Sequence, residues 1–169
     1  MQQAFPDATF IRPAVMFGPD DAFLTRLVRL IRILPVYPLF GTGKTRLQPV
    51  YVEDVAEAIS RVLEDRGQAR ASHYEFGGPR IYTYEELIRK IAGQINARTR
   101  LVPMPFVLWR ALAWVSEFLP GAPLTRNQIA LMQRDNVASG SLPGLSSLGI
   151  APTTIEDVVP AVEGRGPGY

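Results

Sequence analysis

The stretch Gln48-Pro49-Val50-Tyr51-Val52-Glu53-Asp54-Val55-Ala56-Glu57-Ala58-Ile59 decides the fold, because it joins a short apolar strand to an amphipathic helix. Two carboxylates, Glu53 and Asp54, stand in the first turn of that helix, where the helix dipole favours negative charge. Asp54 can accept hydrogen bonds from backbone donors, so we expect it to cap and orient the helix, with a catalytic role as the alternative. A strand that leads straight into a helix is typical of an α/β protein.

A second stretch, Ile11-Arg12-Pro13-Ala14-Val15-Met16-Phe17-Gly18-Pro19, ends another short strand. Together the two stretches resemble the second half of an extended or atypical short-chain dehydrogenase/reductase of the NAD-dependent epimerase/dehydratase superfamily. Within it, they are most similar to the group of the NAD(P)-binding accessory subunit of respiratory complex I. The resemblance covers residues 8 to 162 but only half of such a protein, which suggests that the sequence is truncated.

Two motifs that the superfamily uses are not found in this sequence. No G-x-x-G-x-x-G or G-x-G-x-x-G follows a strand, although such a turn places the dinucleotide phosphates at a helix start. None of the six tyrosines has a lysine four residues later, so the Tyr-x-x-x-Lys pair of proton-transfer catalysis is missing. The resemblance therefore implies NAD(P) as the cofactor of a full-length parent, weak or no binding by this chain, and no catalytic residue within it.

The expected fold class is α/β, a partial Rossmann-like fold with the late strands of a parallel sheet, followed by a helix-rich substrate-binding subdomain. The expected boundaries are 1–76 for the dinucleotide-type part, 77–163 for the helix-rich part, and 164–169 for a loose tail. Residues 36–40 and 46–52 flank a glycine-containing loop, which predicts a hairpin or two irregular strands. We expect further short strands at 8–11, 73–76 and 100–102, and helices at 22–34, 53–64, 84–96 and 106–118. Two shorter helices should follow capping patterns at Thr125 and Thr153, and a capping box at Thr83 should begin the helix at 84.

The resemblance also implies a site. The backbone at Pro13, Ala14 and Val15 would lie under the nicotinamide of a bound dinucleotide, and Phe17, Gln48 and Tyr51 would contact the substrate. The alternative for the first group is that Arg-Pro merely ends a strand. Val15 stands where nucleotide-sugar enzymes usually carry an asparagine, and an aliphatic side chain cannot donate that hydrogen bond, so a nucleotide-sugar substrate is disfavoured.

Composition excludes several kinds of site and partner. The chain has no cysteine and a single histidine, His73, so it offers no thiolate nucleophile, no thiolate metal site and no multi-histidine metal site, and we expect no metal. A net charge of +2 on 169 residues is too small to indicate nucleic acid. The N-terminus lacks the pattern of a signal peptide. We expect a cytoplasmic protein, with a peripheral position on a membrane as the alternative.

Two surfaces could bind a partner. The helix expected at 106–118 is apolar around most of its circumference, which indicates either ordinary core or an interface for a partner, a lipophilic ligand or a membrane surface. Arg26, Arg29 and Arg32 form a stripe that is either a solvated face or a site for an acidic partner or phospholipid.

Half a parallel sheet would leave strand edges open, so we expect a homo-oligomer or pairing with the missing N-terminal half. A respiratory-complex partner follows from the resemblance. A non-catalytic interaction or assembly module is the alternative function.

Overall fold

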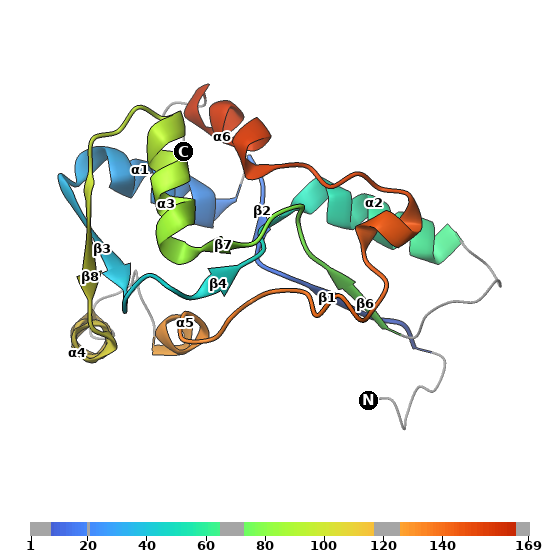
Figure 1. Cartoon of the computed structure of the whole chain (residues 1–169), viewed down its shortest axis with the longest axis horizontal. Helices are drawn as coiled ribbons and strands as arrows, with labels where there is room; N and C mark the ends of the chain where they lie inside the picture. Colours follow the sequence, from blue (N-terminus) through green and yellow to red (C-terminus); the bar gives the residue numbers. More distant parts are fainter. Residues whose placement is uncertain (1–7, 20, 65–72, 117–125, 165–169) are drawn as a thin grey trace.

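The computed structural model describes residues 8–19, 21–64, 73–116 and 126–164 (Figure 1). The described strands are β1 (Phe10–Pro13), β2 (Met16–Phe17), β3 (Val36–Phe40), β4 (Arg46–Leu47), β5 (Val50–Tyr51), β6 (His73–Phe76), β7 (Tyr82–Thr83) and β8 (Arg100–Met104). The helices are α1 (Ala22–Ile33), α2 (Val52–Glu64), α3 (Tyr84–Gln94), α4 (Phe106–Ser116), α5 (Arg126–Leu131) and α6 (Ile155–Gly164), with a 3₁₀ turn, η1, at Leu145–Leu148.

The strands form four two-stranded units, and three of these are parallel. β1 pairs with β6, β2 with β5 and β3 with β8, whereas β4 and β7 are antiparallel. Parallel neighbours need a long connection, so each of these pairs joins segments far apart in the sequence. The mixture of parallel strands and helices confirms the expected α/β class.

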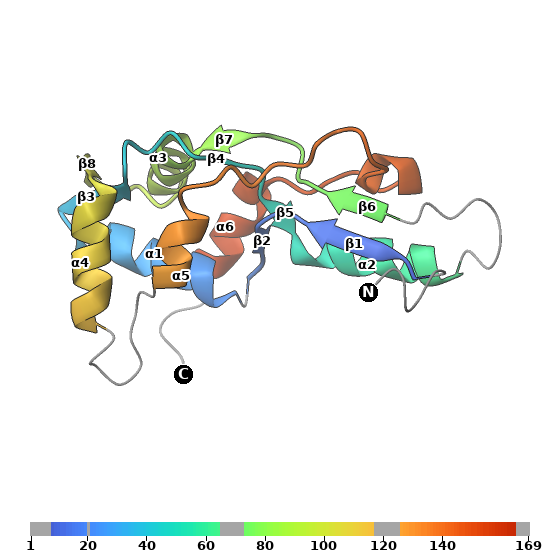
Figure 2. The same cartoon turned by 90° about the horizontal axis from the view of Figure 1, so that it is seen from below.

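The elements gather toward two ends of an elongated molecule. β1, β6, α2 and η1 lie at one end, and α1, β3, β8 and α4 lie at the other (Figures 1 and 2). Each end has its own hydrophobic cluster. The larger one unites buried side chains of α1, β3, α3 and α6, and the smaller one those of α2, β6 and η1.

Most elements lie where the sequence predicts them. α1, α2, α4 and β6 agree with their expected ranges to within two residues, and β8 extends the expected 100–102 piece to Met104. Thr83 caps α3 in a full capping box, since its hydroxyl accepts from the Glu86 amide and the Glu86 carboxylate accepts from the Thr83 amide. At α6 the cap is one residue later than expected, with Thr154 bonded to Asp157. The expected cap at Thr125 lies outside the described residues.

Residues 36–40 and 46–52 were expected to form a hairpin or two irregular strands, and the hairpin is wrong whereas separate short strands are observed. β3 pairs in parallel with β8, and β4 pairs with β7, so the two runs never pair with each other. Gly41 and Gly43 both have positive φ, as a turn requires, but the turn sends the chain to a different partner. Turn chemistry is local, whereas the choice of partner strand depends on segments more than 30 residues away.

α4 is not ordinary core. Trp109 donates its indole N–H to the Leu39 carbonyl at 3.0 Å, and its ring lies 4.3 Å from that of Phe40, which anchors one side of the helix. The opposite side faces solvent, with Val107 72% exposed and Leu108 53% exposed. The expectation of ordinary core is therefore wrong for the outer side of this helix, and an interface on that side stays a prediction.

Asp54 also differs from its expected role, although it remains structural. Its buried carboxylate accepts from the Thr153 amide at 2.6 Å and from the Thr153 hydroxyl at 3.0 Å. These bonds tie α2 to the segment that precedes α6, whereas a cap would have bound the amides of α2 itself. Because α2 packs in the smaller hydrophobic cluster and α6 in the larger one, this carboxylate links the two.

We predict that Asp54→Ala lowers the free energy of unfolding by about 1 to 3 kcal/mol, because two donors of Thr153 lose a charged acceptor in a buried place. Urea unfolding followed by circular dichroism measures this. The matched control is Glu57→Ala on the same helix, which breaks an exposed ion pair with Arg61 and should cost about 0.5 kcal/mol or less. Equal effects of the two substitutions would contradict the linking role of Asp54.

Candidate functional site

A small cleft opens where β1 and β6 end. Its volume is about 210 Å³, and it is lined by Arg12, Pro13, Ala14, Glu75, Asp135, Asn136, Val137 and Ala138. The Ala14 amide donates to the Phe76 carbonyl at 2.8 Å, which holds the first wall against the end of β6. The carboxyl ends of parallel strands are where open α/β sheets bind ligands. Two of the three residues expected under a nicotinamide, Pro13 and Ala14, therefore line this cleft.

The opposite wall, residues 135–138, is held by backbone pairing. The Gln48 amide donates to the Asn136 carbonyl at 3.0 Å, and the Asn136 amide donates to the Arg46 carbonyl at 2.8 Å. Asp135 accepts from both the amide and the guanidinium of Arg46, each at 2.8 Å, and these bonds lower the pKa of its carboxyl group. No strand or helix pattern in the sequence marks this wall, so sequence reasoning missed it.

Glu75 is the second carboxylate of the cleft. It accepts from the Ser139 hydroxyl at 2.6 Å and from the Ser139 amide at 2.7 Å. The hydroxyl bond, then the amide bond, and to a smaller extent the positive charge of Arg12 lower the pKa of this carboxyl group. Glu75 is thus ionised at neutral pH and cannot donate a proton to a ligand there.

Gln48, expected to contact the substrate, holds the two walls in place. Its side-chain amide donates to the Gly78 carbonyl at 2.8 Å, and its side-chain oxygen accepts from the Ala138 amide at 3.0 Å. The backbone comes so close that a Cβ on Gly77 would lie 2.4 Å from the Gln48 amide carbon. Gln48 therefore positions the cleft, from β6 on one side to Ala138 on the other.

The other expected site residues lie away from the cleft. The Val15 carbonyl accepts from the Val50 amide at 3.0 Å, and its side chain packs against the larger cluster. Phe17 is 2% exposed, and its ring lies 5.7 Å from that of the half-buried Tyr51. The structure brings Pro13, Ala14 and Gln48 together, and it groups Val15, Phe17 and Tyr51 in the adjoining core.

A larger depression of about 580 Å³ runs along α3 and is lined by Tyr82, Glu86, Arg89, Lys90, Gly93 and Gln94. Its two cations are engaged within the protein. Arg89 pairs with Glu85 at 2.5 Å, and Lys90 pairs with Glu156 at 3.3 Å. The carboxyl ends of parallel strands do not reach it, so we favour the smaller cleft as the candidate site.

The arrangement of the cleft suits binding rather than acid–base catalysis. Among the residues that the structure describes, no tyrosine, lysine or histidine lines it. Elsewhere, the hydroxyls of Tyr37 and Tyr84 hydrogen-bond to each other at 2.8 Å inside the larger cluster, and burial raises the pKa of both groups. Within residues 8–19, 21–64, 73–116 and 126–164, no group of three His, Cys, Asp or Glu side chains could hold a metal ion. Nor is any helix in these ranges long and apolar enough to cross a membrane.

Comparison with known proteins shows what the chain is related to. Residues 1–77 match the family described as the NAD dependent epimerase/dehydratase family, and the chain is related to that family. A human epimerase family protein solved with NADPH has a similar fold, with a TM-score of 0.65 at 15% identity over 90% of this chain and 46% of that one. The agreement extends well beyond the matched segment.

Sequence relatives point to one subunit within this broad family. NADH dehydrogenase (ubiquinone) 1 alpha subcomplex subunit 9, a mitochondrial protein, is 39% identical in Arabidopsis thaliana over 69% of this chain and 32% identical in Rattus norvegicus over 92% of it. The chain spans only 29% of the Arabidopsis protein and 41% of the rat protein. The chain is therefore related to this subunit, but it spans less than half of the subunit's length. The expected resemblance is confirmed.

We predict that Ser139→Ala raises the pKa of Glu75 toward the ordinary value for glutamate. The hydrogen bond from the Ser139 hydroxyl is the largest cause of the lowered pKa of Glu75, and this substitution removes it. A depressed pKa adds stability above the unfolded value, about 4.5, and this stability is lost as the pH falls through the folded value. The difference in unfolding midpoint between the two proteins should therefore be larger at neutral than at strongly acidic pH. Carbon-detected NMR titration of the Glu75 carboxyl group checks the pKa itself.

The control for this titration is Ser141→Ala, which removes the hydroxyl bonded to Ser139 but neither of the Glu75 contacts. It should leave the titration of Glu75 close to that of the unchanged protein. If Glu75 titrates identically with and without the Ser139 hydroxyl, the described electrostatics of the cleft are wrong.

Proposed function

We propose that this chain is the C-terminal part of an NAD(P)-binding, dehydrogenase-like protein related to the NADH-ubiquinone oxidoreductase accessory subunit. The observation that carries the proposal is the wall made by Pro13 and Ala14 at the carboxyl ends of the parallel strands β1 and β6. An apolar wall of Pro13 and Ala14 beside the exposed residue Asn136 suits a nicotinamide, because the ring needs an apolar contact and the carboxamide needs a donor and an acceptor.

In this proposal Val15 supports the wall through its bond to Val50, and Gln48 sets the width of the cleft. We also propose that Phe17 and Tyr51 contact the substrate. Because both pack in the adjoining core, a substrate would reach them only if that core opened. We propose that the dinucleotide-type part of the chain ends at residue 76. The cofactor wall lies before this boundary, and the helix-rich part follows it. The chain alone is proposed to be inactive, because its cleft holds no proton-transfer pair.

The first test is titration of the ¹⁵N-labelled chain with NADPH, followed by NMR. We expect a dissociation constant of about 1 mM or weaker, equivalent to about −4 kcal/mol, because only the nicotinamide wall is present. Shifts should be confined to the amides of Ala14 and residues 136–138. Ala14→Leu should abolish them, whereas Ala56→Leu on the exposed face of α2 should not. Binding in the low micromolar range would show that the phosphate site had been misplaced.

The second proposal concerns assembly. Apart from the edge of β4, which bonds to Asn136, the two-stranded units have outer edges without a strand partner among the described residues. Open edges attract further strands. We propose that a second copy or the N-terminal half of the parent covers them. Because the relatives are subunits of a respiratory complex, we also propose a respiratory-complex partner and a position peripheral to the membrane, rather than free in the cytoplasm.

Light scattering over a series of concentrations tests the assembly. We expect the mass of a dimer that dissociates on dilution, since a two-fold contact between identical edges is the simplest closure. A monomer at every concentration would rule out the homodimer, and the N-terminal half would then be the proposed cover for these edges.

A further inference from the structure

Charge is distributed unevenly along the chain. Residues 22–52 contain five basic side chains and no acidic one. Residues 87–116 also contain five basic side chains and no acidic one. These two segments therefore hold ten of the 18 basic residues and none of the 16 acidic ones. The net charge of +2 conceals this separation.

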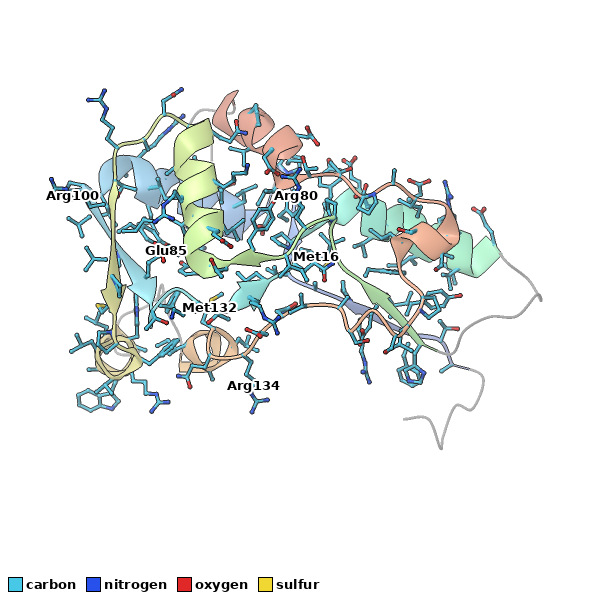
Figure 3. All side chains as sticks on the ribbon, in the orientation of Figure 1. Met16, Arg80, Glu85, Arg100, Met132 and Arg134 are labelled. Atoms are coloured by element: carbon cyan, nitrogen blue, oxygen red, sulfur yellow. The ribbon has the colours of Figure 1, made fainter. Side chains whose placement is uncertain are left out.

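The fold brings the two basic segments together. The first contains α1 and β3, the second contains β8 and α4, and the parallel pairing of β3 with β8 joins them. All four elements lie at the same end of the molecule in both views (Figures 1 and 2). Arg29, Arg98 and Arg100 are exposed there, and none has an ion pair with a described carboxylate. Arg100 extends outward from β8 (Figure 3).

The same end exposes apolar side chains. Successive residues of an α-helix are rotated by about 100°, which places five apolar side chains on one continuous arc of α4: Trp114, Val107, Ala111, Leu108 and Leu112. All five are exposed, and no charged or amide side chain interrupts the arc. Beside it, Val36 and Val102 are 46% and 45% exposed on the outer face of the β3–β8 pair.

We propose that the face formed by the outer arc of α4, the outer side of β3 and β8, and the surrounding arginines binds the surface of an anionic phospholipid bilayer. Apolar side chains enter the boundary between headgroups and acyl chains, tryptophan is favoured at that depth, and arginines pair with lipid phosphates. An acidic protein would satisfy the arginines but would leave the aliphatic arc without a matching surface. The proposal deepens the peripheral position proposed above and does not depend on dinucleotide binding, so vesicle binding and NADPH titration can fail separately.

The test is flotation of the whole chain with two kinds of vesicle, pure phosphatidylcholine and an equimolar mixture of phosphatidylcholine with phosphatidylglycerol. We expect binding to the mixed vesicles, weakened by salt, and little binding to the neutral ones. The double variant Val107→Asp/Leu108→Asp should bind at least about tenfold more weakly. Ile81→Asp is the matched control, because Ile81 is as exposed as Leu108, at 53% each, but lies outside this face.

The charge contribution has its own pair of variants. Arg100→Gln should weaken binding to the mixed vesicles about fivefold. Arg134→Gln, at an exposed position after α5 that is not part of this face (Figure 3), should change it less than twofold. Thermal melts confirm that each variant is folded. The proposal is overturned if the chain binds neither vesicle or both equally, or if Ile81→Asp matches the double variant. It is also overturned if the double variant abolishes a dimer while vesicle binding persists, since the face would then belong to a second copy.

Discussion

The buried carboxylate of Asp54 is the interaction on which the two halves of this molecule depend. It receives two hydrogen bonds from Thr153, 99 residues away, and so fixes the approach to α6 against the start of α2. The short strands β2, β4, β5 and β7 lie in the same middle part of the molecule, between the two ends (Figure 1). The cleft lies at the end of β6, whose side chains belong to the smaller cluster, and Gln48 sets the spacing of its two walls.

The sequence predicts the local elements well because their signals are local. Helical periodicity sets the ranges of α1 and α2, and the spacing from Thr83 to Glu86 predicts the capping box. Strand partners are a different matter. The pairing of β3 with β8 depends on segments that are distant along the chain, and a glycine turn after Phe40 indicates a hairpin as strongly as it indicates a change of direction.

The candidate site divides in the same way. Pro13 and Ala14 are found from the end of a strand and from the family resemblance, and both line the cleft. The wall at residues 135–138 has no regular period of its own and is fixed by backbone bonds to Arg46 and Gln48, so nothing in its sequence indicates it. Gln48 lies near the expected site, but its side-chain nitrogen and oxygen both form hydrogen bonds within the protein. A sequence motif can therefore predict where a residue lies without predicting what it binds.

We propose that this chain is the later part of a dinucleotide-binding fold whose phosphate site is encoded elsewhere. Sequencing the transcript upstream of the Met1 codon tests it most directly. We predict that the reading frame continues upstream and encodes a strand, a glycine-rich turn and a helix. The same upstream segment should also contain a tyrosine four residues before a lysine. An in-frame stop codon just ahead of Met1, with a translation start signal between them, would contradict it.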